Sequence, residues 1–440
     1  MVNIPVLQIS KIPRFTSYGW GIVVLSALAM VATLPGRTHG LGMITERLLA
    51  DPTLELDRQS FGLVNFWATM IGSLFCIPAG WMLDRWGARK TLVLVVGLLG
   101  LVVMTMSIAA GFLPFAMLIT CTRGLGQSAL SVISISMTGK WFRTQLPLAT
   151  GVYSILVSLG FAAAFILARG QRDVDWRVLW SGFGAILLLF LCPLFALFVR
   201  SAPSDPAAPS DLAAPSAIPN PLNENDYSLH QALATPAFWA FGLATSLYGL
   251  VSSGVSLFNE SLLIEQGFEK TAFYDLGMMT TAIGLGSNLL TGWLAIRMRM
   301  TWLTGIAMGL LGGALLGLPS VRTYPALVTY ACVMGGAGGM ITVLFFTIWA
   351  KLFGSAELGR IQGVAQMMTV IASALGPMVL AEVKTRTGTY LPAIHGLGVM
   401  ALILAVGINL IPQPREKPRE KPREIDAESH QGSAGNVATP

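Results

Sequence analysis

The chain is divided into apolar blocks of about 20 residues, each almost free of charge. A helix of that length crosses roughly 30 Å of hydrocarbon, and the backbone in lipid forms either helices or closed barrels. Barrel strands would be about 10 residues long with alternating polarity, which these blocks are not. Only 11% of the residues are charged, against about 25% in soluble domains. The pattern predicts an all-α polytopic membrane protein.

Twelve such blocks are present. They cover residues 18–46, 61–83, 91–112, 115–141, 147–168, 176–199, 236–260, 273–296, 301–319, 325–352, 360–382 and 390–411. Residues 200–235 are rich in Pro, Ala and Ser and lack apolar periodicity, which favours a flexible linker. The sequence therefore predicts a segment at 1–17, six-helix bundles at 18–199 and 236–412, a linker at 200–235, and a disordered tail at 413–440 whose repeated PREK units cannot pack a core.

The distribution of Lys and Arg predicts the orientation. With the N-terminus in the cytoplasm, the inner loops and tails hold 17 of the 28 basic residues and the outer loops hold 9, as expected for an inner or plasma membrane protein with both termini and the linker cytoplasmic. This bias accounts for the net charge of +6 without a nucleic-acid partner. We expect a monomer whose partners are the lipid bilayer and a small-molecule substrate.

No pattern typical of an enzyme is present. The four cysteines each lie alone in an apolar block, the four histidines are scattered, and no phosphate-binding loop occurs. We therefore expect no metal, no cofactor and no catalytic activity.

The stretch GWMLDRWGARKTL, residues 80–92, concentrates charge between two apolar blocks. It has a weak copy, GWLAIRMR, at 292–299, which is 212 residues downstream. GLGMITERLL at 40–49 and GVSLFNESLL at 254–263 are related at a similar offset. The spacing indicates two duplicated six-helix repeats that face each other across an axis along the membrane normal.

With that architecture, GWMLDRWGARK resembles the signature between helices 2 and 3 of the major facilitator superfamily. The matching residues are Gly80, Asp84, Arg85, Gly87, Arg89 and Lys90. The resemblance implies two bundles that open alternately to each side, with helices 1, 4, 7 and 10 around a central cavity and this loop as a latch against the other half. We expect the two glycines to form the turn and the three basic residues to surround Asp84. The second copy has Ile296 in place of the acid, so one latch is expected. A role as topology anchors alone is the alternative.

Two arginines lie inside predicted helices. Arg37 follows Pro35 and Gly36 in helix 1, Arg123 lies in helix 4 in a motif that resembles the helix 4 arginine of the same family, and His39 follows Arg37 closely. Ionisable groups at membrane depth are candidates for function, and Arg matches the planar geometry of a carboxylate or phosphate. The pattern favours an anion site. Alternatively, Arg123 is a structural residue that bonds to backbone carbonyls or to a neighbouring helix, and His39 is a packing residue.

GWGIVV at 19–24 and TPAFWAFGLATSLYG at 235–249 resemble the monocarboxylate and oxalate/formate carriers. This branch implies a basic residue in the outer half of helix 1 and an Asp/Arg pair in helix 8, where this chain has only Asn288 as a strongly polar residue. We therefore expect a small organic anion, a carboxylate of unknown skeleton. Further candidate substrate contacts are Tyr153, Tyr248, Asn259 and Asn288.

Proton coupling has three candidates. His39 titrates near neutral pH, and Glu46 and Glu260 occupy equivalent positions near the outer mouth. Efflux of amphiphilic drugs is an alternative function, although helix 5 lacks the G-x-x-x-G-P pattern typical of drug antiporters. A membrane sensor that does not transport is a further alternative, but the chain carries no additional folded domain that would signal.

Overall fold

The computed structural model describes residues 14–142, 145–169, 174–200, 202, 226–269 and 272–411, and in these ranges the regular structure is entirely helical. Most of the predicted linker and nearly all of the predicted terminal segments lie outside the described residues. The exact domain boundaries therefore remain predictions.

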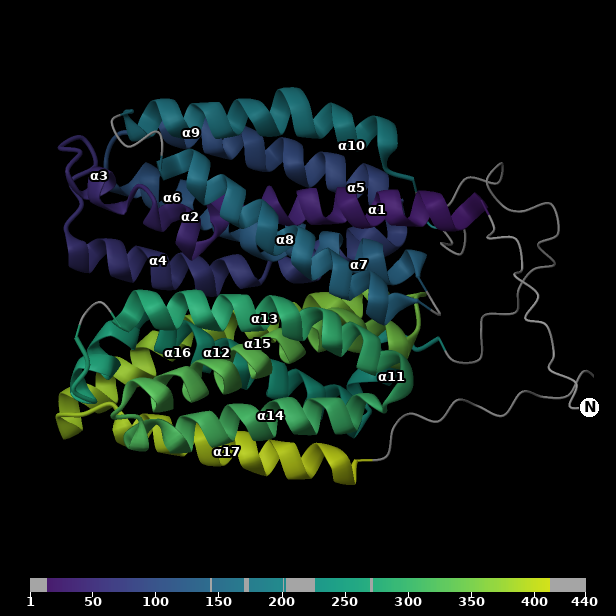
Figure 1. Ribbon diagram of the computed structural model, residues 1–440. Helices are drawn as coiled ribbons and strands as arrows, with labels where there is room; N and C mark the ends of the chain where they lie inside the picture. Colours follow the sequence, from purple (N-terminus) through teal and green to yellow (C-terminus); the bar gives the residue numbers. More distant parts are fainter. Residues whose placement is uncertain are drawn as a thin grey trace, which may run out of the picture.

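The first half of the chain forms one bundle, shown in purple to teal in Figure 1. Its helices are α1 (Arg14–Val31), η1 (Leu34–Gly36), α2 (Thr38–Gly42), α3 (Thr45–Leu49), α4 (Arg58–Ser73), α5 (Cys76–Ser107), α6 (Phe112–Thr122), η2 (Arg123–Leu130), α7 (Ser131–Trp141), α8 (Leu146–Arg169), α9 (Trp176–Ala185), η3 (Ile186–Leu191) and α10 (Cys192–Phe198). We call it the N bundle.

The second half forms the C bundle, which lies alongside the first (Figure 1). Its helices are α11 (Leu229–Leu233), α12 (Pro236–Glu265), α13 (Ala272–Arg297), α14 (Met300–Gly317), η5 (Leu318–Ser320), α15 (Tyr324–Phe353), α16 (Leu358–Thr387) and α17 (Leu391–Leu410). The described N-terminus, α11 and the end of α17 are at the same end of the molecule (Figure 1), which we call the linker end.

The helix α5 contains the end of the second membrane pass, which begins in α4, and the whole of the third pass, and the two are joined at Gly87. This glycine has φ 77° and ψ 167°, outside the helical region and readily adopted only without a Cβ. The Thr91 hydroxyl donates a hydrogen bond to the carbonyl of Met82 at 3.1 Å, although nine residues of straight helix would separate them by about 13 Å. The chain therefore turns back within α5. Six passes in each bundle follow, and the predicted twelve-helix architecture is confirmed.

The membrane block predicted over 18–46, with a break or kink at Pro35 and Gly36, is not one continuous helix. Regular helix ends at Val31, and η1, α2 and α3 follow as separate short pieces. Pro35 lies in the first turn of η1, where its missing N–H costs least. A Cβ on Gly36 would lie 2.2 Å from the carbonyl oxygen of Thr122, so the break in helix 1 lets η1 pack directly on the start of η2.

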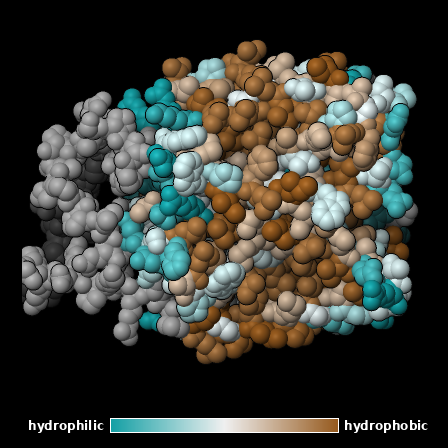
Figure 2. Space-filling view, turned by 180° about the vertical axis from the view of Figure 1, so that it is seen from behind, coloured by the Kyte–Doolittle hydropathy of each residue, from teal (hydrophilic) through white to brown (hydrophobic). Residues whose placement is uncertain are grey.

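On the face shown in Figure 2, a broad apolar belt lies between two polar ends. Many large apolar side chains of the molecule are exposed, for example Ile108 at 79% and Leu189 at 79%. Exposed apolar surface on this scale marks a membrane interaction rather than contact with water. Inside, buried residues from 22 to 199 form the core of the N bundle, while the core of the C bundle extends across the interface to residues such as Tyr153.

A polar cluster ties the loop before α4 to the start of α9. Asp51 pairs with Arg177 at 3.0 Å and accepts a hydrogen bond from the Trp176 indole at 3.0 Å. Burial raises the pKa of Asp51, but hydrogen bonds from Thr53 and Trp176 and the charge of Arg177 outweigh it and lower that pKa below its ordinary value. The cluster holds the loop before α4 against the start of α9, at the end of the molecule opposite the linker end.

Candidate substrate site and gate

Arg123 is buried at the first residue of η2, where helix 4 widens into a π-helix. Its guanidinium donates to the Asn65 amide oxygen at 2.7 Å, the Gln127 amide oxygen at 2.9 Å and the Thr38 hydroxyl at 3.0 Å. A longer bond of 3.3 Å reaches the carbonyl of Gly36. Its Nε has no hydrogen-bond partner among the described residues. All of these partners are neutral, so the positive charge is solvated but not cancelled.

Arg37 lies next to this group, at the C-terminal end of η1. Its Nε donates to the Thr33 hydroxyl at 2.6 Å, and a terminal nitrogen donates to the Ser131 hydroxyl at 3.0 Å. The guanidinium also lies over the ring of Phe161, 5.5 Å from its centre. The side chain is only half-buried. Within the described ranges, no ion pair involves Arg37 or Arg123.

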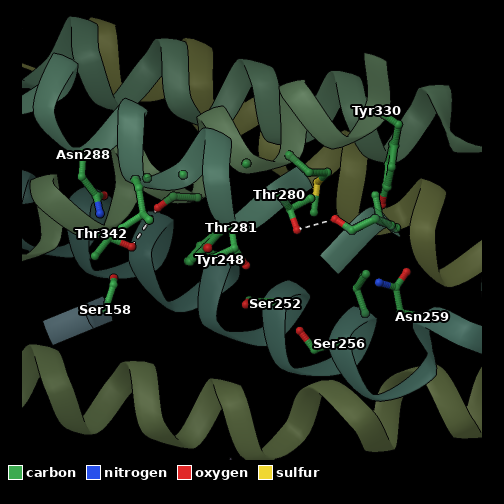
Figure 3. A pocket seen from close by; sticks show the side chains of 18 residues that line it. Ser158, Tyr248, Ser252, Ser256, Asn259, Thr280, Thr281, Asn288, Tyr330 and Thr342 are labelled. Carbon is green, nitrogen blue, oxygen red and sulfur yellow. Dashed lines mark hydrogen bonds between the residues drawn. The ribbon is translucent and has the colours of Figure 1, made fainter. Parts of the chain in front are cut away.

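A cavity of about 310 Å³ lies mainly within the C bundle, between α12, α13 and α15, with α8 closing one side. Figure 3 shows its polar side chains pointing inward from all four helices. Those labelled are Ser158, Tyr248, Ser252, Ser256, Asn259, Thr280, Thr281, Asn288, Tyr330 and Thr342. Arg37 does not line this cavity; it lies over Phe161 of α8, which is one turn from the lining residue Ser158 on the same helix face.

Three residues named from the sequence, Tyr248, Asn259 and Asn288, line the cavity. Tyr153 does not. It is fully buried, its hydroxyl lies 2.7 Å from that of Ser134, and its ring packs on Phe346. The structure thus places Tyr153 in the core between the bundles rather than in contact with the cavity.

The remaining hydroxyl residues of the cavity were not identified from the sequence. A signal for some of them was present in α12, where polar residues recur every three or four positions at 248, 252, 256 and 259. This spacing places them on one helix face. In isolation each resembles an ordinary helix-packing residue, which is why the stripe was missed.

The proton-coupling candidates are spread over the structure. The side chain of His39 lies outside the described residues. Glu46, in the first turn of α3, and Glu260, in α12, are both exposed. No three metal-binding side chains gather within the described ranges.

Asp84 connects the two bundles. Its carboxylate accepts hydrogen bonds from the backbone N–H groups of Gly359 and Arg360, both at 2.9 Å, at the start of α16. It also pairs with the ammonium group of Lys140 at 3.0 Å, and the two side chains are only 5% and 3% exposed. A buried carboxylate at a helix N-terminus is stabilised by the free N–H groups and by the helix dipole. Asp84 thus joins α5 of the N bundle to α16 of the C bundle.

The predicted surroundings of Asp84 need correction. Arg85, Arg89 and Lys90 are exposed, and Arg85 lies over the ring of Trp81. The cation that pairs with Asp84 is Lys140, from the end of α7. The ammonium group of Lys140 is buried beside Asp84. Arg85, Arg89 and Lys90 are closer to Asp84 in the sequence, but their side chains are exposed.

The predicted roles of the two glycines also differ. Gly87 alone makes the turn, whereas Gly80 lies at the contact between the bundles. A Cβ on Gly80 would lie 2.2 Å from the carbonyl oxygen of Gly359, and one on Gly363 would lie 2.6 Å from the carbonyl oxygen of Cys76. The helices α5 and α16 therefore cross with their backbones in contact.

A second glycine crossing joins α8 to α13. A Cβ on Gly292 would lie 2.8 Å from the carbonyl oxygen of Pro147, and one on Gly151 would lie 3.3 Å from that of Asn288. Each of these four residues is related to a member of the first crossing by 212 positions. The two crossings together form a pseudo-symmetric contact, which we call the glycine seal. Beside it, the hydroxyls of Thr150 and Thr347 lie 2.7 Å apart.

The latch has no counterpart in the second repeat. Ile296 stands where Asp84 would be, and Lys351, in place of Lys140, donates instead to the carbonyl of Ala295 at 2.7 Å. The residue that corresponds to Gly359, whose N–H bonds to Asp84, is Pro147, which has no N–H to donate. The carboxylate contact between the two bundles is thus made from the first repeat, at Asp84.

Comparison with known proteins agrees with this arrangement. The family model for the Major Facilitator Superfamily matches residues 15–377. An uncharacterized 38 kDa protein encoded in the 23S RNA operon of Thermoproteus tenax is 26% identical over 396 residues, covering 88% of this chain and 92% of the relative. Monocarboxylate transporter 10 of Mus musculus is 23% identical over 418 residues, covering 90% and 79%.

Among solved structures, the human organic anion transporter MFSD10 (TETRAN) superposes with a TM-score of 0.63 at 17% identity, covering 90% of this chain and all of the other. A likeness at that identity concerns the fold alone. The chain belongs to the major facilitator superfamily, and it is an integral membrane transport protein.

Proposed function

We propose that this protein is a secondary active transporter that moves a small organic anion, a carboxylate, by alternating access. The observation that carries the proposal is the pair Arg37 and Arg123, two guanidinium groups within the membrane-spanning part of the N bundle with neutral partners only. An uncancelled charge in such a place is costly, and an anionic substrate would offset that cost.

The two arginines have different tasks in this proposal. Arg37 is half-buried and lies beside the helix face that reaches the cavity, so it contacts the carboxylate. Arg123 is 2% exposed, and its guanidinium is occupied by the side chains of three helical segments. It contributes positive potential and holds helix 1 to helix 4. Monocarboxylate transporter 10, a relative by sequence, supports the substrate class.

The latch and the glycine seal close the linker end in this proposal. Opening that end breaks the contact of Asp84 with α16 and separates both glycine crossings, while Arg85, Arg89 and Lys90 anchor the loop at the membrane surface. We place the linker end in the cytoplasm of a cell membrane and the protein as a monomer in the bilayer. His39 is the proposed proton carrier, with Glu46 and Glu260 as alternatives near the outer mouth.

Efflux of amphiphilic drugs is less well supported. The cavity is lined by many small hydroxyl and amide side chains, whereas pockets for large apolar ligands are lined mostly by hydrophobic and aromatic groups. Activity that survives loss of Arg37 would favour this alternative.

The test is uptake of labelled carboxylates into proteoliposomes, with and without a pH gradient. Arg37→Ala should abolish uptake, while Arg322→Ala, which removes an exposed arginine outside the site, should leave it unchanged. Dependence on the pH gradient that disappears in His39→Gln would support proton coupling through His39. Equal uptake by wild type and Arg37→Ala would reject the anion proposal.

A further inference from the structure

Eight of the residues that line the cavity carry a hydroxyl group. Four of them donate their single proton to a carbonyl four residues earlier in their own helix, at 2.8–2.9 Å: Ser158, Thr280, Thr281 and Thr342. A hydroxyl has one proton and two lone pairs. What these side chains can still offer a ligand is therefore the lone pairs.

Asn288 adds a stronger observation. Its side chain is only 5% exposed and its amide oxygen has no hydrogen-bond partner among the described residues. Figure 3 shows Asn288, Thr342 and Ser158 at the same end of the cavity. An acceptor that is buried without a partner costs about 1–3 kcal/mol. Rotation of the Asn288 side chain would bring this oxygen to a ligand in the cavity, and a hydrogen bond from that ligand would remove the cost.

The charge of the cavity narrows the class of ligand. Its described lining contains no acid, lysine, arginine or histidine. A carboxylate placed here would have no cation to pair with, and an ammonium group would be desolvated without a counter-charge, which is costly. Neutral polar groups, above all alcohols, which both donate and accept hydrogen bonds, suit the lining best.

We propose that this cavity binds the hydroxyl groups of the transported anion, so that the substrate is a polyhydroxylated carboxylate. Its carboxylate lies toward Arg37 in the N bundle and its hydroxyl-bearing carbons lie in the C bundle against Asn288 and Thr342. The carboxylate half of this statement rests on the proposed function, whereas the hydroxyl half rests on the cavity. The volume of about 310 Å³ is at the small end for ligand pockets and suits a molecule of a few carbons.

The test is isothermal titration of the purified protein in detergent with matched six-carbon probes: gluconate, hexanoate and sorbitol. Binding is measured rather than uptake because protonated hexanoate crosses bilayers unaided. Gluconate should bind at least tenfold more tightly than hexanoate or sorbitol, since only gluconate satisfies both regions. Glycerate, propionate and glycerol repeat the comparison with three carbons.

Each of the other possible binding results would reject one part of the proposal. Hexanoate bound as tightly as gluconate would overturn the hydroxyl inference and leave the anion proposal standing. Sorbitol bound as tightly as gluconate would overturn the anion proposal and leave the hydroxyl inference standing. Tighter binding of 6-aminohexanoate than of gluconate, or no binding of either hydroxylated acid, would overturn the hydroxyl inference.

Substitutions in the cavity test whether the difference in affinity between gluconate and hexanoate arises there. Thr342→Val and Asn288→Leu keep side-chain volume and remove polar atoms, and each should weaken gluconate binding about threefold to tenfold without changing hexanoate binding. Thr304→Val is the control, because Thr304 is buried in α14, outside the cavity, and makes the same bond to a carbonyl four residues earlier. Equal weakening of both ligands, at an unchanged unfolding midpoint, would contradict the inference.

Discussion

Asp84→Asn should shift the protein toward a state that is open at the linker end. The substitution keeps the size of the side chain and one acceptor oxygen, but it removes the charge that pairs with Lys140 at 3.0 Å and faces the start of α16. Removing one partner of a buried ion pair costs about 3–5 kcal/mol. We take the lower end, about 3 kcal/mol, because Asn retains one hydrogen bond. At about 1.4 kcal/mol per factor of ten, the ratio of closed to open molecules falls about 100-fold.

The assay is labelling of a single cysteine, Ser154→Cys, in a background without native cysteines. Ser154 is 3% exposed and lies one turn after Thr150 in α8, on the side of the glycine seal away from the linker end. In inside-out vesicles, a membrane-impermeant maleimide should label this cysteine far faster in the Asp84→Asn protein, and transport should fall. Asp57→Asn is the matched control, since Asp57 caps α4 with the same chemistry away from the gate.

A second variant separates the latch from a general loss of stability. Lys140→Met combined with Asp84→Asn removes both charges, so that no unpaired ion remains buried. The double variant should recover part of the protection of the introduced cysteine against labelling. If Asp84→Asn leaves the labelling rate at the wild-type value, the carboxylate contact does not hold the gate and the reasoning fails.

Two further predictions concern packing and pH. Gly80→Ala places a methyl group 2.2 Å from the carbonyl oxygen of Gly359 and should prevent closure of the glycine seal. Labelling of the cysteine at position 154 should then rise, and transport should be lost. Gly309→Ala is the control and should behave as wild type, because a methyl group there has nothing within 4 Å. The lowered pKa of Asp51 means that its bonds contribute stability at neutral pH that is lost as the pH falls through this pKa. Asp51→Asn should therefore lower the thermal unfolding midpoint at pH 7, and the difference from wild type should shrink below about pH 4; a constant difference would contradict it.

The architecture could be predicted because the membrane leaves few alternatives. Block length and the offset of 212 residues together predicted twelve helices in two related bundles, and the structure has this fold. Asp84 could also be found from the sequence, since it is the one acid in a charged stretch between two apolar blocks. Each of these signals is local or periodic.

What could not be predicted depends on contacts between distant segments. Lys140 is 56 positions from Asp84, and in the sequence it was no better a partner than the three neighbouring basic residues. The role of Gly80 depends on Gly359 in the other bundle. The cavity is lined by residues from four helices, and four of its hydroxyls donate to their own helices, so the polar spacing in α12 alone does not reveal a site that it shares with the other helices.

The two repeats contribute equivalent positions to the glycine contacts but differ in their charged and polar side chains. Each glycine crossing joins a helix of one bundle to a helix of the other, and the two crossings use equivalent positions of the two repeats. The charges are not shared: the uncancelled arginines lie in the N bundle, and the cavity, mainly in the C bundle, is lined by neutral side chains. A substrate that satisfies both must itself be asymmetric, with charge at one end and hydrogen-bond donors at the other. Such a molecule would join the bundles when bound and would release them to separate when it leaves, which is the coupling that alternating access requires.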